Sequence, residues 1–229
     1  MYGRILLKLS GEALGKPDDT FDFDTLERVC GVIKRVVDAG VQTALVVGGG
    51  NIWRGRAGAA MDRTRADQMG MLATVINALA IADTLERLGV AADVQSALRT
   101  DAAEPFNRSR AVKSLEDGRV VIFAGGLGNP FFTTDTAAIL RGAEINADAV
   151  LLAKNIDGVY SADPKKDAGA VKYDTITYER ALDEKLGVTD LTASALGLTN
   201  RVPLYVFELK DPENIYRAAM QEKIGTLVT

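Results

Sequence analysis

Short apolar runs alternate with amphipathic stretches along nearly the whole chain. The runs are rich in Val, Ile, Leu and Ala, and their length and composition are typical of buried strands. Strands are predicted at residues 4–9, 43–48, 91–96, 119–125, 148–153 and 203–208. Helical spacing of apolar residues predicts helices at 24–39, 65–88, 108–117, 134–145, 190–200 and 212–220. This alternation predicts an α/β sandwich with a mainly parallel sheet.

Two segments differ from the regular pattern. The helix predicted at 65–88 contains many alanines, so much of its surface is small and apolar. Such a helix fits a core position and also fits a subunit contact, and the sequence leaves both interpretations open. Residues 154–178 are rich in Lys, Asp, Gly and Pro, which predicts irregular structure or a hairpin at a boundary between two lobes.

The composition is typical of a globular protein. Of the 229 residues, 47 % are hydrophobic and 25 % are charged, and we find no run long enough to cross a bilayer. The opening MYGRILLKLSG lacks a cleavage-site pattern, so we expect a cytoplasmic protein. The net charge of −4 argues against a nucleic-acid-binding surface. Cys30, the single cysteine, lies in a helical pattern and is expected to be buried and unreactive.

The chain contains no histidine. Histidine is the commonest general base and a frequent metal ligand, so its absence excludes Ser-His-Asp hydrolysis and His-ligated zinc. Any chemistry must therefore depend on lysines, carboxylates, backbone dipoles and the positioning of substrates.

The segment AGGLGNPFFTTDTAA, residues 124–138, follows a predicted strand and leads into a predicted helix. Its glycines can adopt positive φ and allow a ligand to approach the backbone. Thr133 and Thr134 offer hydroxyl groups where the helix start exposes unpaired N–H groups, a combination that favours an anion. Asp135 would be repelled by that anion unless a cation lay between them, which indicates a role in organising charge.

Two further loops have a similar design. Residues 8–15 place Lys8 at the carboxyl end of the first strand, and residues 46–55 end the second strand in three consecutive glycines. Each pattern alone is also typical of a tight turn. Because ligands bind beyond the carboxyl ends of strands in open α/β sheets, three such loops predict one phosphate-binding crevice. The spacing of a P-loop is absent from the sequence, so a different nucleotide-binding fold is indicated.

A local excess of arginine follows the second glycine loop. Residues 54–65 carry Arg54, Arg56, Arg63 and Arg65 against one acid, Asp62. The cluster fits a small anionic ligand and fits a solvated basic loop equally well.

Six motifs occur here in the order seen in the bacterial UMP kinases of the amino acid kinase family. They are KLSGEALG, GGGNIWRG, DQMGMLATVINALA, GNPFFTTDTAA, KNIDGVYSADP and EKIGTLV, which together cover essentially the whole chain. The resemblance implies a single domain over 1–229 with an α/β/α sandwich fold. Its two lobes would be 1–150 on the UMP side and 151–229 on the ATP side. It also implies magnesium-dependent transfer of a phosphoryl group from ATP to UMP, giving UDP in pyrimidine biosynthesis.

The resemblance also implies roles for individual residues. Lys8 would neutralise charge on the transferring phosphoryl group, Arg54 would bridge toward the ATP phosphates, and Asp135 would orient Lys8 or organise the magnesium. The ATP-binding residues would be Lys8, Leu9, Ser10, Gly11, Gly50, Arg54, Asn155, Tyr160 and Asp163. Without the resemblance, Tyr160 is equally typical of a packed aromatic residue and Asp163 of a turn. Lys154 is not assigned to the catalytic set, because family members differ near it.

On the acceptor side, Gly49 would face the UMP phosphate and Asp67 would hold the nucleoside. The loop that wraps UMP would consist of Leu127, Gly128, Asn129, Pro130, Phe131, Phe132, Thr133 and Thr134. No residue of the chain is assigned as a metal ligand, and magnesium is expected with ATP. The missing histidine agrees with this reaction, because UMP near neutral pH is largely a dianion and requires no general base.

Regulation and assembly are less determined by the sequence. The segment 16–22, KPDDTFD, is shorter than in many relatives, where GTP activation is associated with the nearby surface, so GTP control is left open. The family is commonly a homohexamer built as a trimer of dimers through its long helix, which fits the apolar residues 65–88. Two rival functions remain: an amino acid kinase acting on a carboxylate or carbamate, and a nucleotide-binding protein without activity.

Overall fold

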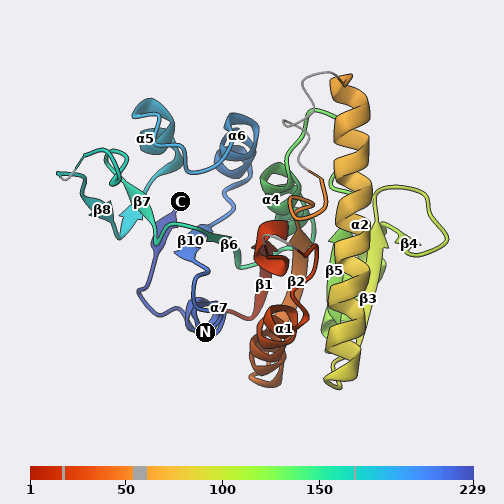
Figure 1. Ribbon diagram of the computed structural model, residues 1–229. Helices are drawn as coiled ribbons and strands as arrows, with labels where there is room; N and C mark the ends of the chain where they lie inside the picture. The colour runs from red at the N-terminus through yellow and green to blue at the C-terminus, as the bar shows by residue number, and fades with distance from the viewer. Residues whose placement is uncertain (17–18, 54–60, 168) are drawn as a thin grey trace.

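A mainly parallel sheet forms the centre of the computed structural model, which describes residues 1–16, 19–53, 61–167 and 169–229 (Figure 1). Within these residues, nine strands follow the order β4-β3-β5-β2-β1-β6-β10-β11-β9. Among the described strands of this sheet, only β10 and β11 pair antiparallel. The strands are β1 (Arg4–Leu9), β2 (Gln42–Val47), β3 (Ala92–Ser96), β4 (Glu104–Pro105), β5 (Val120–Ala124), β6 (Ala149–Lys154), β9 (Thr175–Ile176), β10 (Leu204–Glu208) and β11 (Thr226–Val228). A separate hairpin pairs β7 (Val159–Tyr160) with β8 (Lys172–Tyr173).

Helices cover both faces of the sheet. One core contains apolar residues of α1 (Phe23–Asp38), α2 (Arg63–Arg87) and α7 (Glu213–Ala219). The other contains residues of α3 (Arg108–Glu116), α4 (Thr134–Glu144), α5 (Tyr178–Asp183) and α6 (Leu191–Asn200). Strand residues alternate between these cores, because successive side chains of a strand point to opposite faces. Ile5 and Leu7 pack in the first core, for example, while Leu6 packs in the second. The predicted three-layer sandwich is therefore confirmed.

The six predicted strands and six predicted helices are all present, with ends shifted by at most two residues. The structure adds short elements that the sequence did not indicate, namely the 3-10 helix η1 (Gly11–Leu14), the helix α5 and several strands of two or three residues. The segment 154–178 contains the β7–β8 hairpin, one of the two alternatives that its composition indicates.

Helix α2 is 25 residues long and meets the length and composition expected of a membrane span. The sequence-based statement that no such run exists is therefore wrong. Half of its most apolar window is buried inside the protein, however, and its inner side packs against β2, β3 and β5 as a core helix. Its outer side leaves Met69, Leu72, Ile76 and Leu79 exposed.

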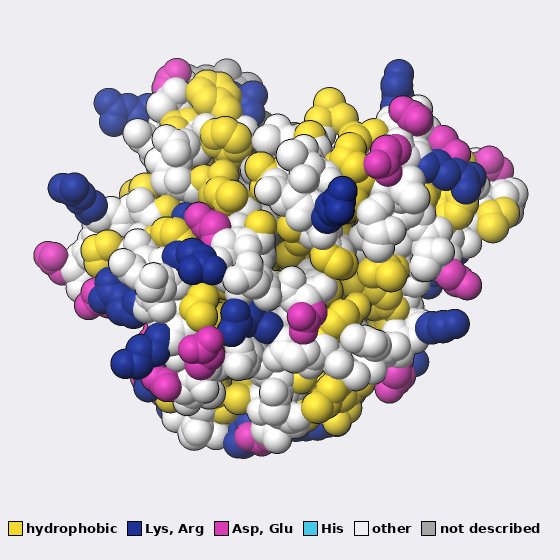
Figure 2. Space-filling model, turned by 180° about the vertical axis from the view of Figure 1, so that it is seen from behind, with side chains coloured by type: hydrophobic (Ala, Val, Ile, Leu, Met, Phe, Trp, Pro, Cys, Tyr) yellow, Lys and Arg dark blue, Asp and Glu magenta, His cyan; other side chains and the backbone are white. Residues whose placement is uncertain are grey.

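Parallel pairing brings four loops to one edge of the sheet. β5, β2, β1 and β6 are neighbours in the sheet, and each pair among them is parallel. The segments that follow these strands therefore meet at the edge where all four strands end, as the glycine loops predicted. On the face of the molecule that Figure 2 shows, basic and acidic side chains are mixed. The described residues form no large basic patch in that view.

Candidate active site

Lys8, Asp135 and Lys154 form a cluster of charges at this edge. Lys8 lies near the end of β1, Lys154 ends β6, and Asp135 lies in the first turn of α4. The Nζ atom of Lys8 is 2.8 Å from Oδ1 of Asp135, and the Nζ atom of Lys154 is 3.4 Å from Oδ2. One carboxylate thus holds two ammonium groups, and both of its oxygens have a cationic partner.

The cluster is mostly withdrawn from water, with exposed side-chain fractions of 12 % for Lys8, 15 % for Asp135 and 24 % for Lys154. Burial acts to raise the pKa of Asp135, but the ammonium groups of Lys8 and Lys154 outweigh burial and hold that pKa below its usual value. Asp135 is therefore ionised near neutral pH, and the cluster carries one net positive charge. Such a site attracts phosphate.

Asp135 is positioned by the cap of its own helix. The Thr133 hydroxyl oxygen accepts hydrogen bonds from the backbone N–H groups of Asp135 at 3.1 Å and Thr136 at 3.2 Å. It also donates to Oδ2 of Asp190 at 2.5 Å, and Asp190 caps α6 by accepting from the Ala193 N–H. Asp190 has no distinctive signal in the sequence, because an aspartate before a helix is typical of an ordinary N-cap.

The loop after β2 fits tightly against the loop after β1. A Cβ atom at Gly11 would lie 2.5 Å from the Gly48 carbonyl oxygen and 2.7 Å from the Gly50 nitrogen. Only glycine is therefore compatible with this approach at position 11. The predicted contact residue Leu9 has its side chain in the core and its carbonyl accepts from the Gly48 N–H, so Leu9 offers a ligand its backbone only.

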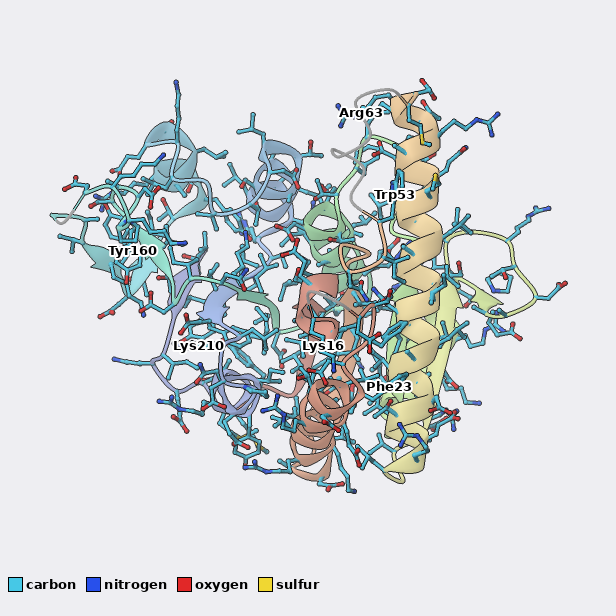
Figure 3. All side chains as sticks on the ribbon, viewed as in Figure 1. Lys16, Phe23, Trp53, Arg63, Tyr160 and Lys210 are labelled. Atoms are coloured by element: carbon cyan, nitrogen blue, oxygen red, sulfur yellow. The ribbon has the colours of Figure 1, made fainter. Side chains whose placement is uncertain are left out.

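A cavity of about 150 Å³ lies on the α2 side of the charge cluster. Its lining includes seven residues predicted to contact the acceptor: Gly49, Asp67, Leu127, Asn129, Phe132, Thr133 and Thr134. The other three predicted residues, Gly128, Pro130 and Phe131, belong to the same loop but do not line the cavity as described. Trp53 also lines it, and Figure 3 shows this side chain beside α2.

Residues 125–133, which connect β5 to α4, are called the acceptor loop from here on. Asp67 holds this loop through Phe131. The Phe131 N–H donates to Oδ2 of Asp67 at 2.8 Å, and Phe131 has a φ of 72°, which is uncommon for a residue with a side chain. The guanidinium of Arg63 lies 4.8 Å from the centre of the Phe131 ring and 3.6 Å from Asp67. Asp67 thus positions the same loop that the sequence assigns to the acceptor.

A second cavity, of about 410 Å³, lies on the other side of the cluster and is lined by Lys154, Tyr160 and Asp163. Tyr160 is on β7, on the far side of the molecule from α2 (Figure 3). Its hydroxyl donates to Asp157 at 2.8 Å, and Lys172 donates to the other oxygen of Asp157 at 2.9 Å. The predicted residues Ser10 and Asn155 line a different hollow, of about 270 Å³, on the α1 side of the sheet.

The sequence profile of the Amino acid kinase family matches residues 3–207. The chain belongs to this family. Among solved structures, it is similar to the UMP kinase from Bacillus anthracis, with 37 % identity over 100 % of this chain and 96 % of that one and a TM-score of 0.96. The UMP kinase from Ureaplasma parvum matches with 37 % identity, coverage of 100 % and 99 %, and a TM-score of 0.95. The uridylate kinase from Archaeoglobus fulgidus matches with 29 % identity, coverage of 98 % and 99 %, and a TM-score of 0.78.

Two further basic residues considered from the sequence of this amino acid kinase are Lys154 and Arg54. Lys154, which the sequence leaves outside the catalytic set, lies in the charge cluster, where its ammonium group contacts Asp135 and donates to the Val188 carbonyl. Arg54 lies outside the described residues. The described residues contain no group of three or more acidic or cysteine side chains able to hold a metal ion.

Proposed function

We propose that this chain is a UMP kinase, which transfers the γ-phosphoryl group of ATP to UMP and produces ADP and UDP. The observation that carries the proposal is the position of the Lys8–Asp135–Lys154 cluster between two cavities. Lys154 lines the larger cavity, while Thr133 and Thr134, next to Asp135, line the smaller one. The full-length similarity to UMP kinases supports the choice of UMP as acceptor.

In this proposal the larger cavity receives the ATP nucleoside and the smaller one receives UMP. The division into a UMP side over 1–150 and an ATP side over 151–229 follows from it. The γ-phosphoryl group would then lie at the charge cluster, with the backbone of the two tightly packed glycine loops beside it. Thr133 and Thr134, at the start of α4, would receive the UMP phosphate, because a helix N-terminus favours an anion.

The transfer itself requires charge stabilisation and alignment. UMP needs no general base, because the second pKa of a phosphate monoester is about 6. The ammonium groups of Lys8 and Lys154 would stabilise charge on the phosphoryl oxygens, which is the main task that this reaction sets a protein. Asp135 would keep both groups in place without touching the phosphate.

Magnesium fits this site as part of the ATP complex, where it would neutralise phosphate charge. Both oxygens of Asp135 already contact a lysine, so this carboxylate is better suited to orienting Lys8 than to binding the metal. Of the two roles that the resemblance allows for Asp135, the geometry favours orientation of Lys8.

The same proposal includes a homohexamer, built as a trimer of dimers, and a cytoplasmic location in pyrimidine biosynthesis. The exposed apolar side chains of α2 support a contact between subunits. No role in binding nucleic acid or membranes is proposed.

ADP release from magnesium-ATP, measured with one acceptor at a time, tests the proposal. The acceptors are UMP, CMP, dUMP, AMP, acetylglutamate and carbamate. Fast release with UMP is the expected result. Fast release with acetylglutamate or carbamate alone would assign the chain to another kinase of the family, and ATP binding without turnover for any acceptor would favour a non-catalytic protein.

A further inference from the structure

Two buried polar side chains of α2 contact the loops that follow β2 and β5 at the active-site edge. Thr74 is 3 % exposed and Asn77 is fully buried. Residues three positions apart lie on the same face of a helix, so both side chains point from α2 toward the ends of β2 and β5. A buried polar group is costly unless it is hydrogen-bonded, and each of these two is bonded to a loop.

Thr74 holds the start of the acceptor loop. Its hydroxyl accepts from the Gly125 N–H at 2.8 Å and donates to the Met71 carbonyl within α2 at 2.7 Å. Gly125 has a φ of 74°, and a Cβ atom there would lie 3.0 Å from the Leu98 nitrogen. The chain therefore turns sharply at the point where the hydroxyl holds it, immediately before the residues that line the smaller cavity.

Asn77 holds the loop after β2. Its amide nitrogen donates to the Gly48 carbonyl and to Oδ1 of Asn51, both at 2.7 Å, and its oxygen accepts from the Asn51 amide at 3.0 Å. The Asn51 amide also donates to the Thr20 carbonyl at 2.9 Å. Two side-chain amides thus pair reciprocally and fix both ends of the three-glycine turn.

Close backbone packing accompanies these hydrogen bonds. A Cβ atom at Gly49 would lie 2.8 Å from the Gly70 carbonyl oxygen and 2.9 Å from the Ala73 Cβ, so loop and helix are in direct contact. The Trp53 indole N–H donates to the Ala66 carbonyl at 2.9 Å. The same face of α2 therefore contacts both loops, and it sets the distance between them.

We propose that Thr74 and Asn77 are positioning residues for phosphoryl transfer, which hold the acceptor loop and the three-glycine loop in fixed register. The inference rests on the proposed function, which places UMP against the first loop and phosphates of both substrates against the second. The Thr74 hydroxyl is hydrogen-bonded to the acceptor loop and Thr74 also lines the smaller cavity, whereas only its backbone nitrogen approaches Gly49 of the three-glycine loop. Loss of the hydroxyl should therefore weaken UMP binding selectively. Asn77 touches the three-glycine loop, against which the proposed function places phosphates of both substrates. Its loss should therefore lower kcat and affect both substrates.

The helix provides a matched control in Thr84. This threonine is also buried on α2, and its hydroxyl donates to the Ala80 carbonyl at 2.8 Å. It lies ten residues after Thr74, beyond the glycine loops, and contacts neither of them in the described structure. T74V and T84V therefore both remove a buried hydroxyl from the same helix, but only T74V removes a contact to an active-site loop.

The experiment measures kcat and the KM values for UMP and ATP in the wild type, T74V, T74S, T84V and N77A, together with thermal unfolding. Leaving the buried Gly125 N–H without a partner should raise the KM for UMP roughly 10-fold in T74V. The KM for ATP should stay unchanged, and T74S should restore the wild-type KM for UMP. T84V should lose a similar amount of thermal stability with wild-type kinetics. N77A should lower kcat roughly 10-fold.

If N77A does not fold, N51A removes the same reciprocal pair from the loop side and should lower kcat in the same way. An unchanged KM for UMP in T74V, or equal kinetic changes in T74V and T84V, would overturn the role of Thr74. Unchanged kcat in N77A or N51A would overturn the role of Asn77. A wild type that fails to phosphorylate UMP would instead refute the proposed function, so the two failures are distinguishable.

Discussion

The ammonium group of Lys8 and the carboxylate of Asp135 lie 2.8 Å apart although they come from different elements, β1 and the first turn of α4. Both side chains are mostly buried, so the contact is only weakly screened by water. The pair fixes Lys8 at the edge where the parallel strands end. Lys154 shares the same carboxylate, which leaves one net positive charge for a phosphoryl group.

The first prediction concerns Lys8. K8A should lower kcat roughly 1000-fold, because it removes a preorganised cation from the transferring group. The variant should remain folded, since Asp135 keeps Lys154 as a partner. K34A is the control, because Lys34 pairs with Asp38 on the exposed side of α1, and it should keep the wild-type kcat. Near-normal turnover in K8A would remove Lys8 from the mechanism.

The second prediction concerns Asp135 and pH. Because its folded-state pKa is lowered, the ionised carboxylate stabilises the folded protein at pH values above the unfolded pKa of about 4. This contribution is lost as the pH falls through the lower folded-state pKa. D135N leaves two buried lysines without their anion and should cost about 3 kcal/mol at pH 7. Urea unfolding should show that difference shrinking well below pH 4.

A suitable comparison for Asp135 is Asp93, whose pKa is also lowered, chiefly by a hydrogen bond from Arg119. D93N should reduce stability in a similarly pH-dependent way but keep the wild-type kcat, since Asp93 lies near the start of β3 and Arg119 directly precedes β5, at the edge of the sheet opposite the charge cluster. A stability difference between D135N and the wild type that stays constant from pH 7 to pH 3 would contradict the assignment for Asp135.

The third prediction concerns Lys154, which contacts Asp135 and lines the larger cavity. K154M should lower kcat roughly 100-fold, because it removes one of the two cations that the proposed function places against the phosphoryl group. K185M is the matched control, since Lys185 lines the same cavity but is exposed. Steady-state kinetics would decide the matter: equal effects of K154M and K185M would leave Lys154 with no specific part in the reaction.

The sequence predicted the long elements well because their burial leaves a regular pattern. β6, for example, was expected at 148–153 and spans Ala149–Lys154, and its run of apolar residues packs into both cores. Helix α5 was missed because six residues are too few to display a helical period, and β11 because it has only three. Asp24 and Glu27 have the spacing of a capping box, but α1 starts at Phe23 and its cap is Asp22, which accepts from the Thr25 N–H.

The site was predictable where its chemistry is local and not where it depends on tertiary contacts. Gly125, Thr133 and Asp135 lie close together in sequence, in the loop after β5 and the first turn of α4, so a phosphate site could be expected from them. Lys154 and Asp190 acquire their roles by meeting residues of α4 that are distant in sequence. The pairing of Asn77 with Asn51 is hidden in the same way, since an asparagine inside an apolar helix gives no indication of its partner.

The fourth prediction concerns the ATP side. If the Tyr160 ring packs against the adenine, Y160A should raise the KM for ATP roughly 10-fold. Y160F retains the ring and loses only the hydrogen bond to Asp157, so its effect should be smaller. The KM for UMP should not change in either variant, because Tyr160 lies on the opposite side of the molecule from Trp53, which lines the smaller cavity (Figure 3). A selective rise in the KM for UMP would instead reverse the assignment of the two cavities.

The fifth prediction concerns the outer side of α2, where Leu72 is 55 % and Ile76 is 48 % exposed. Met69 and Leu79 extend this surface at helical spacing, and a continuous apolar stripe of this kind is unusual on a monomer. The wild type should therefore sediment as an oligomer.

A charge at the centre of that stripe should separate the subunits, because an unpaired carboxylate is costly in an apolar contact. L72E and I76E should sediment as smaller species than the wild type. L191E is the control, since Leu191 is an isolated exposed leucine on α6, and it should leave sedimentation unchanged. A wild type that is monomeric at working concentrations would refute the contact. The inner side of α2 contacts the acceptor loop and the three-glycine loop. Measuring kcat in L72E and I76E therefore also tests whether the contact between subunits supports turnover.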